Sequence, residues 1–216
     1  MNKITDEKIK KGIEYVKKLF EHEYSGHDVF HTLRVYKTAL QIAKGENADL
    51  EIVVFAALLH DVDDIKLSPN TNKNKENARK FLVDNNFDEE KIELICDVIS
   101  EISYRGSETL PAKTLEGRIV QDADRLDALG AIGIARAFAY GGNHNRVMYD
   151  PDILPNLNMT EIEYRNHIST TINHFYEKLF NLKNLMNTDT AKKIAIEREN
   201  FMKEYLNHFY NEWEGK

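Results

Sequence analysis

The segment Ile52–Leu59, IVVFAALL, is the longest apolar run in the chain, and no helical face of it is polar. Because a helix that is apolar on every side has to be covered on every side, this segment predicts a central helix packed among several others. Asp49 is a good N-cap, so we expect this helix over residues 49–61. The apolar run is followed by four ionisable residues, His60, Asp61, Asp63 and Asp64.

The rest of the chain also repeats with helical spacing, and no segment keeps the alternation of a half-buried strand. An all-α fold is therefore predicted, with one domain over residues 1–216 as the default for this length. The expected surrounding helices cover residues 9–23, 28–46, 76–86, 88–102, 114–140, 162–186 and 188–213. The polar segment that begins at Ile65 and contains Pro69 is expected to be a loop that leads into a helix starting near Asn74. The segment 141–160, with two Gly and two Pro, is expected to be a second loop.

Composition excludes several classes of protein. A formal net charge of −7 argues against duplex nucleic acid as the partner, since phosphate binding favours a basic face. Cys96 is the only cysteine, so neither a disulfide framework nor a Cys-rich zinc site is possible. No apolar run approaches the roughly 20 residues of a membrane helix, and the first residues have no signal-peptide core. A cytoplasmic protein that does not bind membranes is expected.

Metal-type ligands recur on otherwise apolar helices. They are His31, the adjacent pair His60 and Asp61, and the aspartates of QDADRLD. A lone histidine is more often a buried polar residue than a ligand, and an aspartate can serve as a helix cap. A His-Asp pair at the end of an apolar helix is different, because both groups are costly to bury unpaired. Mixed imidazole and carboxylate ligands suit Mn²⁺, Fe²⁺, Zn²⁺, Ni²⁺ or Co²⁺ better than Ca²⁺.

These residues stand in the strings GHDVFHTLRV, AALLHDVDD and IVQDADRLDALGAIGIARAF. In them the chain resembles the HD-domain metal-dependent phosphohydrolases, and in particular a small bacterial group that includes a nucleoside triphosphate pyrophosphohydrolase. The resemblance runs from about Gly26 into the C-terminal segment HFYEKLFNL. It implies a single-domain HD helical bundle with a metal-binding core over about residues 20–140 and additional C-terminal helices over about residues 160–214.

The resemblance also implies the ligand set. It consists of His31, His60, Asp61 and the aspartate of the ADRL string, Asp124, around a divalent ion (Mn, Mg, Ni, Fe, Co or Zn). Asp127 lies three residues further along the same helix, so it is an alternative ligand or a residue that supports the ligands. Asp122 is expected to face elsewhere and pair with a basic residue.

Neighbouring residues are candidates for handling the substrate. Asp64 is expected to be the general acid or base, with a solvated turn aspartate as an equally weighted alternative. Arg34 and Lys37 follow His31 on the same helix and can bind phosphate. His27 is a further phosphate-contacting candidate.

Two neighbouring aspartates have plainer roles. The string HDVFH does not match the zinc-peptidase motif H-E-x-x-H, because that motif requires Glu at the position of Asp28. Asp28 is instead a candidate helix cap, and Asp63 is expected at the surface.

The function predicted from this pattern is metal-dependent hydrolysis of a small anionic nucleotide. Cleavage of a nucleoside triphosphate to the monophosphate and pyrophosphate is preferred because of the resemblance. A nucleotide phosphomonoesterase and a non-catalytic nucleotide-binding HD module are the alternatives. The oligomeric state is left open, with a homodimer as one option.

Overall fold

The computed structural model of the protein describes residues 6–21, 28–65, 67–102, 110–157, 159, 167 and 169–216. Helices joined by turns and irregular segments make up these residues, and no strand occurs among them, which confirms the all-α prediction. None of the helices in this part of the chain combines the length and the apolar content needed to span a bilayer. The chain forms two compact units, the first of residues 1–103 and 111–124 and the second of residues 104–110 and 125–216. Whether the chain unfolds as the single domain expected from its length stays a prediction.

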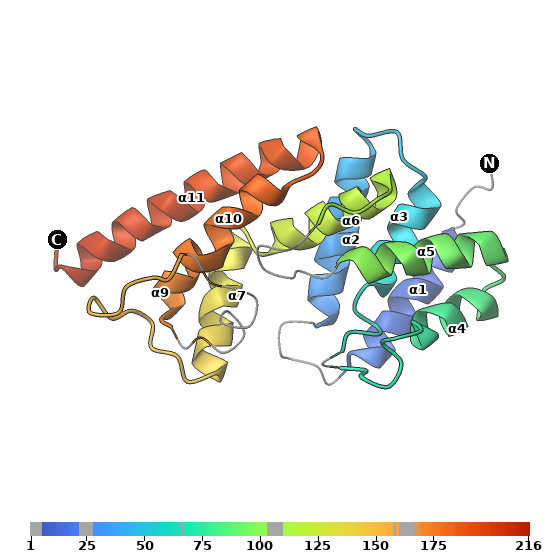
Figure 1. Ribbon diagram of the computed structural model, residues 1–216, viewed down its shortest axis with the longest axis horizontal. Coiled ribbons are helices and arrows are strands. Elements are labelled where there is room, and N and C mark those ends of the chain that lie inside the picture. The colour runs from blue at the N-terminus through green and yellow to red at the C-terminus, as the bar shows by residue number, and fades with distance from the viewer. Residues whose placement is uncertain are drawn as a thin grey trace. The chain divides into compact units, whose positions relative to one another are not determined.

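The first unit is organised around the apolar helix predicted at its centre (Figure 1). Its helices are α1 (Asp6–Leu19), α2 (Val29–Ala43), α3 (Leu50–Leu59), α4 (Glu76–Asp84), α5 (Glu89–Ile102) and most of α6 (Leu115–Asp127). Helices α1, α2 and α5 all pack against α3. Every α3 residue from Glu51 to Leu59 is buried, as a helix without a polar face requires. The side chain of Asp49 accepts hydrogen bonds from the backbone N–H groups of Glu51 and Ile52, which confirms the predicted N-cap.

The helices around α3 differ from the sequence expectation at single positions. Phe30, an apolar residue in the first turn of α2, is 66% exposed. Helix α4 begins at Glu76 rather than near Asn74, since Lys75 has a positive φ of 52° and cannot continue a helix. Leu19, the last residue of α1, is 41% exposed.

The second unit contains the C-terminal part of the chain. Its further elements are α7 (Gly130–Asn143), α9 (Thr171–His174), the π-helix η2 (Phe175–Leu179), α10 (Phe180–Leu182), the 3₁₀ turn η3 (Lys183–Leu185) and α11 (Asp189–Trp213). Helix α11 packs against α7, and α7 also contacts α9. Aromatic rings pack between these elements. The rings of Phe175 and Tyr205 are stacked with their centroids 6.3 Å apart, and the ring of Tyr149 is edge-on to that of Trp213 with centroids 5.0 Å apart.

The single helix predicted over residues 114–140 is wrong, because the chain breaks between α6 and α7. Gly130 has a φ of +72°, a left-handed conformation that glycine tolerates and other residues rarely adopt. A side chain at Gly133 would put its Cβ 2.2 Å from the carbonyl oxygen of Ala128. The two glycines therefore permit a sharp turn that apolar periodicity alone does not reveal.

A partly buried histidine in the second unit, His174, predicts a pH dependence of folding. Burial and, to a smaller extent, the positive charges of Lys178 and Arg146 together lower the pKa of His174 to about 3. The unfolded chain binds a proton at this residue near pH 6.5, whereas the folded chain does not, so stability falls as the pH drops below that value. We expect His174 to account for a loss of about 2 kcal/mol in the free energy of unfolding between pH 7 and pH 5.

Denaturant unfolding at both pH values measures this contribution. The variant His174→Asn should show a correspondingly smaller loss than the wild-type chain. Substituting the exposed His208 on α11 in the same way is the control and should leave the pH dependence unchanged. Equal losses in wild type and His174→Asn would contradict the assignment.

Candidate metal centre

Helices α2 and α3 place two histidines next to each other at their ends. His31 is in the first turn of α2, where Asp28 accepts a hydrogen bond from the His31 backbone N–H at 2.7 Å. This confirms Asp28 as the cap of α2 and fixes the start of the helix beside His31. His60 follows α3 directly, and the packing of α2 against α3 brings both imidazoles into the interior, with exposures of 2% and 8%.

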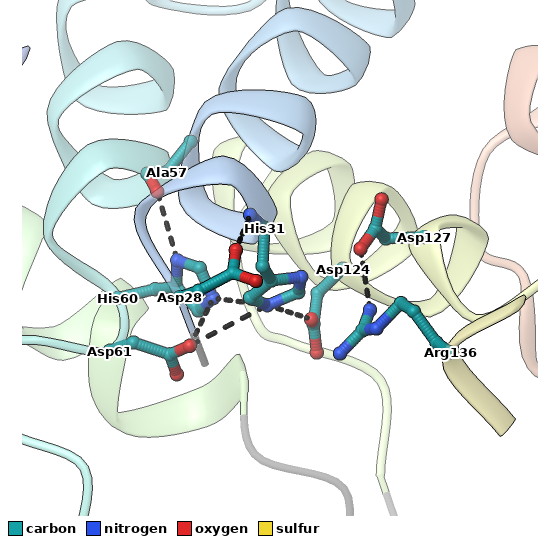
Figure 2. Close-up of polar contacts among 8 residues, drawn as sticks. All are labelled: Asp28, His31, Ala57, His60, Asp61, Asp124, Asp127 and Arg136. Atoms are coloured by element: carbon teal, nitrogen blue, oxygen red, sulfur yellow. Dashed lines mark hydrogen bonds and ion pairs between the residues drawn. The ribbon is translucent and has the colours of Figure 1, made fainter. Parts of the chain in front are cut away.

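The two imidazoles point their Nε2 atoms at each other at 3.3 Å (Figure 2). The Nδ1 atom of His60 lies 2.9 Å from the carbonyl oxygen of Ala57. Because a carbonyl oxygen only accepts, Nδ1 of His60 is the donor, and in a neutral ring Nε2 then carries the lone pair. In this arrangement either a protonated Nε2 of His31 donates to the lone pair of His60, or the lone pairs of both rings bind a metal ion.

Two carboxylates from different parts of the sequence complete the cluster. Asp61 Oδ2 lies 3.3 Å from Nε2 of His60 and 3.5 Å from Nε2 of His31. Asp124, on α6, places Oδ1 3.3 Å from Nε2 of His31. One ligand atom each from His31, His60 and Asp124 lies within 4.8 Å of the other two, a spacing compatible with a shared metal ion. Asp61 is largely buried, whereas 27% of the Asp124 side chain is exposed, so the cluster is open on the Asp124 side.

The pKa values in the cluster show a strong preference for positive charge. Burial by itself would lower the pKa of His60, but the carboxylates of Asp61 and Asp124 and the Ala57 carbonyl raise it to about 9. Burial would raise the pKa of Asp124, but His31 and His60 lower it below its ordinary value. A site that stabilises an imidazolium so strongly also stabilises a metal cation at the same position. The buried, converging imidazole and carboxylate donors therefore fit a divalent ion.

The structure brings together the four residues that the sequence singled out as ligands, and it places the other candidates around α2, α3 and α6. Asp64 is partly buried directly beyond the cluster, and its backbone N–H donates to the carbonyl of Asp61 at 3.0 Å. Arg34 is partly buried and Lys37 exposed, both on α2. His27 lies outside the described residues.

Two aspartates near the candidate ligands have other environments. Asp127, the last residue of α6, pairs with Arg136 at 2.5 Å within the second unit. This contact gives the Asp127 carboxylate a structural role at the α6–α7 break. Asp63, expected at the surface, is only 1% exposed. The residues next to Asp63 in the sequence did not indicate that it is buried, because its hydrogen-bond donors belong to α4.

Comparison with known proteins places this donor cluster in a family. The HD domain family matches residues 29–129, which include every candidate ligand and the Asp64 and Asp127 positions. YpgQ of Bacillus subtilis, an uncharacterized protein, is 37% identical over 194 residues that cover 89% of this chain and 87% of YpgQ. The chain therefore belongs to the HD-domain superfamily of metal-dependent phosphohydrolases.

Solved structures of similar proteins agree with this membership. A protein from Lactobacillus plantarum is 41% identical, with a TM-score of 0.82 over 99% of this chain and 100% of the other. An HD-superfamily hydrolase from Bacillus thuringiensis is also 41% identical, with a TM-score of 0.79 over 97% and 98%. The crystal structure of YpgQ in complex with ADP has a TM-score of 0.73 at 35% identity and covers 93% of this chain and 97% of YpgQ.

The different environments of Asp124 and Asp127 predict different effects on metal content. We expect Asp124→Ala to weaken divalent metal binding at least about 100-fold, because it removes a carboxylate facing His31. Asp127→Ala should retain most of the metal, because its partner is Arg136. Metal content after reconstitution with Mn²⁺ and dialysis measures both. If Asp127→Ala loses the metal and Asp124→Ala keeps it, the assignment of Asp124 as the ligand is wrong.

Proposed function

We propose that this protein hydrolyses nucleoside triphosphates to the monophosphate and pyrophosphate in a reaction that depends on a divalent metal ion. The observation that carries the proposal is the cluster of His31, His60, Asp61 and Asp124, whose converging donors favour a cation at one point inside an HD fold. YpgQ, which is similar over nearly the whole chain, has been crystallised with ADP, and this supports a nucleotide as the substrate.

His31, His60, Asp61 and Asp124 are proposed to hold the metal. When bound, a divalent ion neutralises phosphate charge and lowers the pKa of water to a range in which it attacks near neutral pH. The hydrogen bond from His60 to Ala57 keeps the ring orientation and the tautomer constant while Nε2 faces the ligand cluster. Burial of both imidazoles keeps water from competing with the protein donors.

Residues beside the cluster are proposed to act on the substrate. Asp64 transfers a proton to or from the reacting oxygen, since it follows the His60–Asp61 pair by a single tight turn. Arg34 is three residues from His31 on α2 and so lies on the same helical face, from which its guanidinium can bind two phosphate oxygens. Lys37, exposed one turn further along, adds a point charge for the phosphate chain. His27 is retained as a further phosphate contact.

Product analysis tests the reaction. The chain is loaded with Mn²⁺ and incubated with a panel of ribo- and deoxyribonucleoside monophosphates and triphosphates, and ³¹P NMR identifies the phosphorus products. We expect equal amounts of monophosphate and pyrophosphate. Orthophosphate with the diphosphate, or with nucleoside from monophosphates, would instead favour a phosphatase. Nucleotide binding without any product would favour the non-catalytic alternative.

The role of Asp64 is tested separately. We expect Asp64→Asn to lower kcat by roughly 10²- to 10⁴-fold, the usual contribution of general acid–base catalysis, while Mn²⁺ content stays unchanged. Asp84→Asn, an exposed aspartate at the end of α4, is the matched control and should keep full activity. Unchanged turnover in Asp64→Asn would remove this residue from the mechanism.

A further inference from the structure

Asp63 is a buried acid between two functional candidates, and both of its carboxylate oxygens are used by another helix. Oδ1 accepts a hydrogen bond from the backbone N–H of Asn77 at 3.1 Å, and Oδ2 accepts one from that of Ala78 at 3.0 Å. These donors belong to the first turn of α4, where backbone N–H groups have no partner within the helix. The residue before α4, Lys75, makes no side-chain cap. Asp63 therefore caps α4 from a position 14 residues away from Asn77 in the sequence.

The contact between the turn and α4 is reciprocal. Asn77 donates from Nδ2 to the carbonyl oxygen of Val62 at 3.0 Å and to Oγ1 of Thr71 at 3.1 Å. Asn72, in the loop between α3 and α4, donates from its side chain to the carbonyl oxygen of Asp63 at 2.6 Å. The backbone of residues 62–63 is thus held by side chains of the loop and of α4, while the side chain of Asp63 holds α4 in return.

This anchored turn also contains the His60–Asp61 pair. Val62 N–H donates to the carbonyl of Leu59 at 3.3 Å, and Asp64 N–H donates to that of Asp61 at 3.0 Å. A displacement of Val62 or Asp63 therefore moves the Asp61 backbone directly. Sites of this kind need their groups within about 0.5 Å of the productive geometry, which makes such a displacement costly for metal binding.

We propose that Asp63 is a positioning residue, which fixes the His60–Asp61 pair by anchoring the turn after α3 to the first turn of α4. It acts through its neighbours and needs no contact with metal or substrate. The Asp63 carboxylate accepts hydrogen bonds from two backbone N–H groups at the N-terminus of α4, the positive end of the helix dipole. The negative charge of Asp63 therefore strengthens the contact between the turn and α4. The inference rests on the proposed metal-dependent function, because the pair it positions is the proposed ligand pair.

The test compares two aspartate caps that lie on either side of α3: Asp49 caps α3 itself, whereas Asp63, beyond the other end of α3, caps α4. Asp63→Asn replaces one accepting oxygen with an amide donor and disrupts the anchor beside His60. Asp49→Asn makes the same change at the cap of α3, at the end far from His60. Melting temperature, the Mn²⁺ dissociation constant from equilibrium dialysis, and kcat and KM at saturating Mn²⁺ are measured for both variants.

Asp63→Asn should melt a few degrees lower than the wild type, because both oxygens of Asp63 accept hydrogen bonds and one of them is lost. Asp49→Asn should melt closer to the wild type, because only one oxygen of Asp49 accepts the two cap bonds and asparagine caps a helix about as well as aspartate. Only Asp63→Asn should weaken Mn²⁺ binding, by about 10- to 100-fold, as expected for a residue that supports a ligand. It should also lower kcat at saturating Mn²⁺ with little change in KM. If Asp63→Asn loses thermal stability but keeps the Mn²⁺ affinity and kcat of Asp49→Asn, the role of Asp63 is structural only and the inference is wrong.

A second variant covers the case in which Asp63→Asn fails to fold. Asn77→Ala removes the bond to the Val62 carbonyl but leaves the backbone donors of α4 in place, and it should weaken Mn²⁺ binding in the same direction. Unchanged Mn²⁺ affinity in Asn77→Ala would contradict the inference. A wild-type chain that binds Mn²⁺ but hydrolyses no nucleotide would overturn the proposed function, while a loss of affinity in Asp63→Asn would still support the positioning role. A wild-type chain that binds no Mn²⁺ would overturn both.

Discussion

The first unit depends on one constraint: an ionisable pair has to be buried at the end of a helix that is itself buried on every side. Unpaired, such groups would cost several kcal/mol, so the surrounding elements have to compensate them. His60 is satisfied by the Ala57 carbonyl on one nitrogen, while the other nitrogen faces His31 and Asp61. The raised pKa of His60 and the lowered pKa of Asp124 both show that the cluster is most stable with an added positive charge.

Aspartate has a different task at each position around this cluster. Asp28 caps α2, which contains His31, and Asp49 caps α3, which His60 follows directly. Asp63 caps α4 from outside that helix. Asp124 faces His31, whereas Asp127, three residues later, pairs with Arg136. The chemical group is the same in every case, so the role is decided by whether backbone N–H groups, an imidazole or a guanidinium lies opposite.

Much of the fold could be predicted because its signals are local. The central helix, its Asp49 cap and the helical class follow from apolar periodicity and capping preference. The break between α6 and α7 could not, since the apolar pattern continues through Ala128–Gly130 while the glycines allow a turn. The convergence of His31, His60 and Asp124 was anticipated from family resemblance, because no spacing rule relates three helices that are far apart in the sequence.

The sequence by itself determined that α3 is central and that it ends in a His-Asp pair, because helix burial and capping depend on residues a few positions apart. Only the tertiary structure decided which aspartates face the imidazoles and which instead cap a helix or form an ion pair. Asp63 shows the reason most clearly. Its neighbours in the chain suggest a solvated turn, but its two backbone donors come from α4, and contacts over that sequence distance exist only after the helices have packed.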